Sequence, residues 1–152
     1  MTLTNFLQKD KLPTKIELEN KIKELGYDFK FLTEFEEFDD LHQIDSIDCV
    51  LNRNKTFVEI SLNTTTEIIS KFPSLKEDLS NKDFCISFTF GSDELVIACI
   101  NVISIGLIDL NQSIVLYEDD EIFYTREMLI KDTTNSLQYY QDKTYNLSLI
   151  HI

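Results

Sequence analysis

The chain has few of the residues that interrupt helices and strands, form disulfide bonds or commonly act in catalysis. Its 152 residues include three Gly, two Pro, three Cys and two His. So little Gly and Pro, beside 43% hydrophobic residues, excludes a disordered or low-complexity chain and indicates a folded globular one. The length predicts a single domain spanning 1–152, with a core large enough to need no metal ion or disulfide bond.

The three cysteines, Cys49, Cys85 and Cys99, are odd in number, far apart and without a CxxC pair. Each lies among apolar neighbours, so we expect reduced, buried thiols with a structural role. The N-terminal MTLTNFLQKD lacks the basic and apolar regions of an export signal, so the expected location is the cytoplasm.

Catalytic motifs are also missing. The only histidines are His42 and His151, and the chain has no HExxH, GxSxG, Walker-type or dinucleotide-binding pattern. His42 is near Cys49 in sequence, but an exposed histidine and a buried cysteine are the expected arrangement. The acidic run 118–121 lacks the alternating ligands and the Gly of a calcium loop, and is expected to be a solvated turn. The sequence therefore predicts that the protein is not an enzyme and has no cofactor and no metal site.

Charge is the strongest global feature. Fourteen Lys and Arg against 27 Asp and Glu give a net charge of −13. Such a field repels nucleic-acid backbones and anionic membranes and attracts basic partners. We therefore expect no direct nucleic-acid or membrane binding. The alternative to a basic partner is an acidity that only keeps the chain soluble.

Periodicity and capping residues predict an α+β fold, a mainly antiparallel sheet with helices packed on it. The predicted helices span 14–26, with Thr14 as N-cap and Ile16 among the apolar positions, and 92–109. The stretch 66–80 is ambiguous because Pro73 divides it, and a short helix is assigned to 74–80. Residues 125–141 begin with a capping signal at Thr125 and continue as a helix or an irregular tail. The predicted strands span 27–32, 46–52, 56–62, 83–90 and the start of 113–121. Residues 53–55 are the expected hairpin turn, and the unit 83–117 is expected to add one parallel strand pair. The chain end after 141 is expected either to pair as a last strand or to pack.

The stretch FTFGSDELVIACINVISIGL (88–107) has three possible interpretations: a phosphate-binding turn, a membrane span or a buried strand and helix. A phosphate-binding turn needs several glycines, whereas Gly91 is followed by two acids at the positive end of the helix dipole. The uncharged run between Glu94 and Asp109 has 14 residues, shorter than the roughly 18 to 20 of a membrane span. A central buried helix capped by Ser92 is the prediction.

Acidic residues gather in two segments, 34–48 and 118–121. The first holds seven carboxylates and no Lys or Arg, interleaved with Phe35, Phe38, Leu41 and Ile44. Apolar anchors with a charged rim are typical of interfaces for basic partners. The alternative is an acidic face whose apolar residues point into the core. The predicted partner-binding residues are Glu34, Glu36, Glu37, Phe38, Asp39, Asp40, Asp45, Asp48, Glu118, Asp119, Asp120 and Glu121.

A family resemblance is carried by residues 83–130, DFCISFTFGSDELVIACINVISIGLIDLNQSIVLYEDDEIFYTREMLI. The order of an aromatic strand, a Gly-acid turn, an apolar helix, a short strand with an acidic turn and a further helix resembles immunity proteins of bacterial polymorphic or contact-dependent toxin systems. A helix ending in LGYDF (25–29) and strands reaching TFVEIS (56–61) are compatible with it. Phe90 stands where such proteins often have Trp, and only Gly91 remains of a commoner Gly pair.

The resemblance implies a cytoplasmic inhibitor that binds the C-terminal domain of a cognate toxin stoichiometrically and blocks its active site or an essential surface. Many such toxins are nucleases with basic clefts, which an acidic inhibitor suits. No catalytic residue is carried over, and no oligomeric state is predicted. The alternatives are an acidic scaffold or adaptor domain in a regulatory complex and, with little support from the residues, a small hydrolase.

Overall fold

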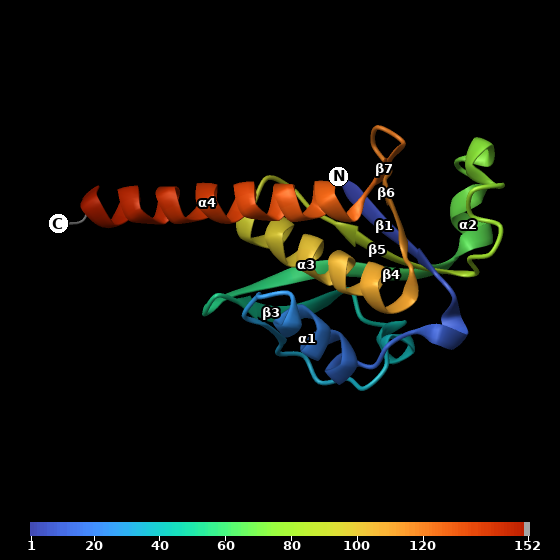
Figure 1. Ribbon diagram of the computed structural model, residues 1–152, viewed down its shortest axis with the longest axis horizontal. Helices are drawn as coiled ribbons and strands as arrows, with labels where there is room; N and C mark the ends of the chain where they lie inside the picture. Colours follow the sequence, from blue (N-terminus) through green and yellow to red (C-terminus); the bar gives the residue numbers. More distant parts are fainter. Residues whose placement is uncertain (151–152) are drawn as a thin grey trace.

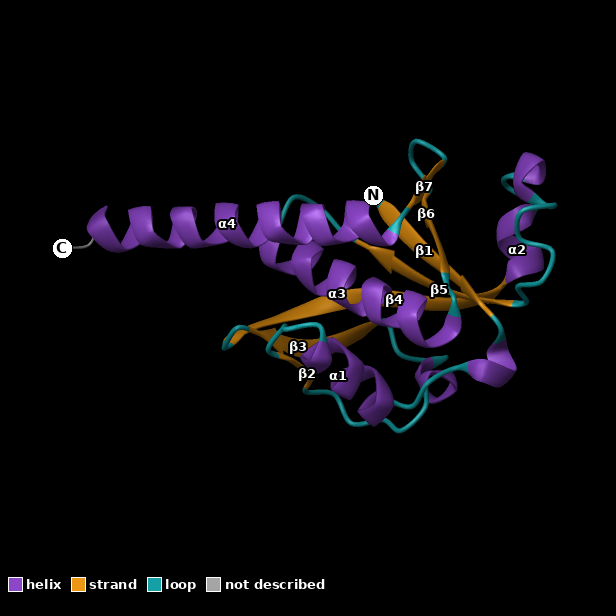
Figure 2. Ribbon diagram, viewed as in Figure 1, coloured by secondary structure: helices purple, strands orange, loops and turns teal. Residues whose placement is uncertain are grey.

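The computed structural model describes residues 1–150, with side chains described up to residue 147, and is built on one seven-stranded sheet. The strands are β1 (Thr2–Leu7), β2 (Phe29–Phe31), β3 (Ser46–Leu51), β4 (Asn54–Thr64), β5 (Phe84–Thr89), β6 (Ile114–Tyr117) and β7 (Ile122–Tyr124). The helices are α1 (Lys15–Glu24), α2 (Thr65–Ile69), α3 (Glu94–Asn111) and α4 (Arg126–Ile150). The predicted α+β class is confirmed, and Figure 2 shows the sheet with its helices.

The strand order is β2-β3-β4-β5-β1-β6-β7, and every neighbouring pair is antiparallel. The N-terminal strand β1 lies between β5 and β6, in register with both. The predicted parallel pair within 83–117 is therefore wrong, because β1 occupies the place between the two strands that α3 connects.

One face of the sheet carries the main core. Helices α1 and α3 lie on this face, and α4 packs along α3 (Figure 1). The predicted buried helix is confirmed as α3, which begins at Glu94 and ends at Asn111. Its N-cap is Asp93 and not Ser92: the Asp93 carboxylate accepts the N–H groups of Leu95 and Val96 at 2.9 and 3.2 Å. A carboxylate at this end also suits the helix dipole.

Helix α3 is 18 residues long and apolar enough, by length and composition, to cross a membrane. The expectation that it is too short is therefore wrong, because the helix continues past both ends of the uncharged run. Two thirds of it is nevertheless buried inside the domain, under the sheet, α1 and α4. The burial, not the length, marks it as a core helix.

The second face of the sheet is only partly covered. A smaller apolar cluster lies there beneath α2 and the turns that follow it; its buried members are Phe6, Ile68, Leu75, Leu79, Cys85 and Leu116. Helix α2 precedes Pro73, which begins a short 3-10 turn, so the helix predicted over 74–80 is wrong. Over β3 and β4 the same face is exposed; we call this region, on which Asp48, Phe57 and Glu59 stand, the open sheet face.

The predicted cap of helix α1 is confirmed, whereas the predicted position of the β3–β4 turn is wrong. Helix α1 has the predicted cap, since Thr14 and Glu17 form a reciprocal capping box, although Ile16 is 68% exposed and not part of the core. The β3–β4 turn consists of Asn52 and Arg53, whose positive φ angles of 50° and 69° fit a two-residue hairpin, and not of residues 53–55.

The C-terminal helix is longer than predicted. Helix α4 begins after the predicted cap, where the Thr125 hydroxyl accepts the N–H of Met128 at 3.2 Å, and continues through Ile150. A last strand after residue 141 is therefore wrong. Figure 1 shows the second half of α4 projecting beyond the sheet, where residues 141–147 are all exposed. His151 lies outside the described residues.

Candidate functional site

Eleven of the twelve predicted contact residues lie in two segments at opposite edges of the sheet, and the twelfth, Asp48, lies on β3. Residues 34–45, which we call the acidic loop, follow the edge strand β2 and reach β3. Residues 118–121, which we call the hairpin tip, join β6 to the other edge strand, β7. The two segments are therefore separated by the width of a seven-stranded sheet, and they form two surfaces rather than one.

The acidic loop is held against the N-terminus of α1. The Lys15 N–H donates to the Glu36 carbonyl at 2.9 Å, and Thr14 forms a β-bridge with Glu37. Inside the loop, Phe38 is completely buried and meets Phe31 edge to face. Phe38 as a partner-binding residue is therefore wrong, because its ring fills the core.

The carboxylates of the acidic loop remain at the surface. Asp39 pairs with Lys9 at 3.5 Å, and Asp40 accepts the N–H of Glu37 at 3.1 Å. Within residues 1–150, Glu34 and Glu36 have no ion pair. The loop thus keeps most of its negative charge uncompensated.

The hairpin tip is partly tied to the N-terminal strand. The Thr4 hydroxyl donates to the Glu118 carboxylate, and the Thr2 N–H donates to the Asp119 carboxylate at 3.1 Å. Asp120 and Glu121 are exposed. Beside the tip, burial raises the pKa of the Tyr117 hydroxyl, and the nearby carboxylates raise it further. The tip is an acidic, solvated turn with two of its four carboxylates anchored.

The open sheet face brings together residues that sequence reasoning did not join. Asp48 of β3 lies directly opposite Phe57 of β4, and Glu59 follows two residues later on the same side of β4. All three are exposed, and Phe57 is 50% exposed. Asp48 was predicted as a contact residue, whereas Phe57 and Glu59 were missed. The sequence pattern that could have revealed these two residues is the alternation in TFVEISL, in which the aromatic Phe57 lies on the polar side of the strand together with Glu59.

The residues considered for catalysis do not form a site. His42 is exposed, with its Nδ1 3.0 Å from the Asp39 carbonyl, while Cys49 is fully buried. Burial raises the pKa of the Cys85 thiol to about 12, and a hydrogen bond with Cys49 together with burial raises that of Cys99. In the part of the chain that the structure describes, no three His, Cys, Asp or Glu side chains are grouped to hold a metal ion.

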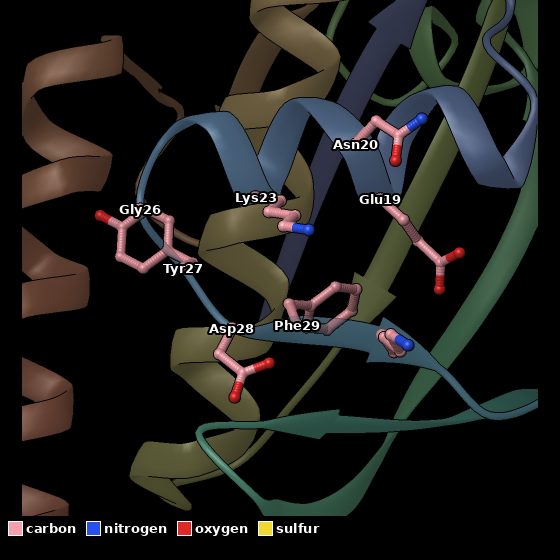
Figure 3. A pocket seen from close by; sticks show the side chains of 8 residues that line it. Glu19, Asn20, Lys23, Gly26, Tyr27, Asp28 and Phe29 are labelled. Carbon is pink, nitrogen blue, oxygen red and sulfur yellow. The ribbon is translucent and has the colours of Figure 1, made fainter.

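A shallow hollow of about 580 Å³ lies between α1 and β2 (Figure 3). Its lining mixes Glu19, Lys23, Tyr27 and Asp28. The Glu19 carboxylate accepts the backbone N–H of Phe31 at 2.8 Å, so it fastens the helix to the strand. The hollow contains neither a histidine nor a cysteine, and its best-defined polar contact has a structural role.

Comparison of the chain with protein-family models, with curated proteins and with solved structures finds no match. The argument for function therefore depends on the surfaces described above.

Proposed function

We propose that the protein is an immunity protein, which binds a basic toxin domain, most simply a nuclease, in a one-to-one complex and blocks its activity. The observation that carries this proposal is the uncompensated charge of the surface. Of the twelve predicted contact residues, only Asp39 forms an ion pair in residues 1–150. Exposed carboxylates of this kind retain their long-range field and attract a cationic partner.

The architecture supports the same function. A large sheet with a buried central helix gives a rigid support, and rigid supports lose little conformational entropy when they bind. Both acidic segments are anchored to it by backbone contacts, the acidic loop through Lys15 and the hairpin tip through Thr2. The order of elements in 83–130 is also the one that resembles immunity proteins.

The test is co-production of this chain with the toxin C-terminal domain encoded directly upstream of its gene. We expect cells to survive the toxin only when the chain is present, and calorimetry to show one-to-one binding that weakens at high salt. A toxin that still kills and does not bind the purified chain would refute the proposal. Recovery of the chain in a regulatory complex, with no toxin gene nearby, would favour the scaffold or adaptor function instead.

A further inference from the structure

The open sheet face exposes an aromatic ring where a sheet normally presents polar groups. Phe57 is 50% exposed, although its strand neighbours Val58 and Ile60 are buried in the core on the other side. Two shallow hollows adjoin the ring. One is lined by Asp45 and Ser61, the other by Gly91 and Val96, and both include Phe57, Glu59 and Thr89. Phe57 therefore lines both hollows.

Two carboxylates flank this ring. Asp48 is its direct cross-strand partner, which places the two Cβ atoms roughly 5 Å apart. Glu59, two residues along β4, lies roughly 7 Å away on the same face. Neither carboxylate belongs to an ion pair of residues 1–150. Glu59 pairs with Thr89 of β5, and Thr89 pairs with Thr2 of β1, whose carbonyl accepts the N–H of Glu118. The cross-strand row that begins at Glu59 therefore leads to Glu118.

Cations of the chain stand on the other side of the ring. Lys55 is two residues from Phe57 in the opposite direction, and Lys30 faces the same row through Val50. The two cation–π contacts found in residues 1–150 involve other rings, Phe35 and Phe84. The face of Phe57 is therefore free of an internal cation. A cation that approaches it meets Glu59 on one side along β4, Asp48 across on β3, and Lys55 on the other side along β4.

We propose that the open sheet face binds an arginine side chain of the basic partner, with the guanidinium stacked on Phe57 and hydrogen-bonded to Glu59 or Asp48. A planar guanidinium can stack on a ring and meet a carboxylate with two parallel N–H groups at once. A lysine ammonium is more strongly hydrated and lacks the planar fork, so it fits this arrangement less well. The inference rests on the proposed function for the identity of the partner as a toxin domain.

The first test uses nona-arginine and nona-lysine peptides as probes, because they carry equal charge. In two-dimensional ¹H–¹⁵N NMR titrations, we expect nona-arginine to shift the amide signals of Asp48, Phe57 and Glu59. Phe57→Leu, which keeps an apolar side chain without the aromatic face, should weaken nona-arginine binding about three- to thirtyfold and weaken nona-lysine binding less. Ile16→Ala, at an exposed apolar residue of α1, is the control and should change neither.

Equal binding of the two peptides, or shifts confined to the acidic loop and the hairpin tip, would overturn the inference. The toxin assay then separates the two proposals. If the chain protects against the toxin but Phe57→Leu and Glu59→Gln protect and bind equally well, the arginine site is wrong and the proposed function stands. If the chain does not bind the toxin domain while the arginine preference persists, the proposed function is wrong and the arginine site stands.

Discussion

Leu18 of α1 lies so close to Gly106 of α3 that a Cβ atom at position 106 would be 2.6 Å from the Leu18 Cδ1 atom. It would also be 3.2 Å from the Cγ1 atom of Ile22. Both side chains are completely buried, so neither can move into solvent. The absence of a side chain at Gly106 therefore sets how closely the two helices approach.

Gly106→Ala is expected to destabilise the protein by about 1 kcal/mol, because overpacking of about 1–3 kcal/mol outweighs the gain in helix propensity. The measurement is the free energy of unfolding in urea. Leu18→Ala alone should cost about 2–5 kcal/mol. In that background Gly106→Ala should become neutral or stabilising, since the closest atom is gone and Ile22 can shift into the space that Leu18 leaves. Additive effects of the two substitutions would contradict the close contact.

The start of α3 provides a second prediction. Asp93→Ala should cost about 1 kcal/mol of unfolding free energy, because it removes the acceptor of two helix N–H groups. Asp93→Asn keeps a side-chain oxygen and should cost less. Ser92→Ala is the matched control and should change stability by less than about 0.5 kcal/mol. A larger loss in Ser92→Ala than in Asp93→Ala would restore Ser92 as the cap.

The buried thiols predict how stability depends on pH. Burial raises the pKa of Cys85 from its ordinary value of 9.0 to about 12, so the folded protein keeps this thiol protonated while the unfolded chain ionises. The contribution of the protonated Cys85 thiol to the free energy of unfolding is therefore fully present below pH 9 and is lost as the pH rises toward 12. At pH 10 the loss should be about 1.4 kcal/mol.

The measurement for Cys85 is the free energy of unfolding at pH 8 and at pH 10. The difference between the two should shrink by about 1.4 kcal/mol in Cys85→Ala, whatever that substitution costs at pH 8. As a second readout, a thiol reagent added to the native protein at pH 8 should react with none of the three cysteines, which are all buried. Rapid labelling of Cys85 in the native state would show that it is accessible.

Charge reversal tests whether the acidic loop attracts the partner. Glu36→Lys with Glu37→Lys should slow association with the toxin domain roughly tenfold at low salt, and less at high salt, where the field is screened. Glu77→Lys with Asp78→Lys changes the net charge equally at exposed positions near α2 and should have a smaller effect. The association rate is measured by stopped-flow fluorescence. Equal slowing in both variants would assign the attraction to net charge alone.

How far the sequence predicts a strand depends on whether its large apolar residues keep to one face. Strand β5 was predictable because Phe84, Ile86 and Phe88 alternate with the smaller Cys85 and Ser87, although both faces of the strand are buried. Strand β1 was missed because its large apolar residues lie on both faces, with Leu3 on one side and Phe6 on the other, so no period of two appears. Its buried Asn5 looks like a loop residue in sequence, although its amide donates to Ser104 at 3.0 Å.

The sequence indicated where the charge of the candidate surfaces lies, but not which side chains face solvent and which face the core. Spacing placed Phe38 among carboxylates, yet spacing alone does not say whether such a ring faces the partner or the core. The backbone contacts that hold the acidic loop against α1 determine that the Phe38 ring faces the core. Asp48 was noted for its charge, whereas its relation to Phe57 depends on the β3–β4 register, which the turn at Asn52 and Arg53 sets.

The central place of β1 has a consequence for synthesis on the ribosome. Thr2–Leu7 is translated before both of its partner strands, Phe84–Thr89 and Ile114–Tyr117. The apolar side chains of Leu3, Phe6 and Leu7 therefore lack their place in the sheet until these two later strands have been made. Pairings this distant in sequence close slowly and leave the nascent chain open to aggregation. Strand β1 can therefore complete its pairing in the sheet only after β5 and β6 have been made.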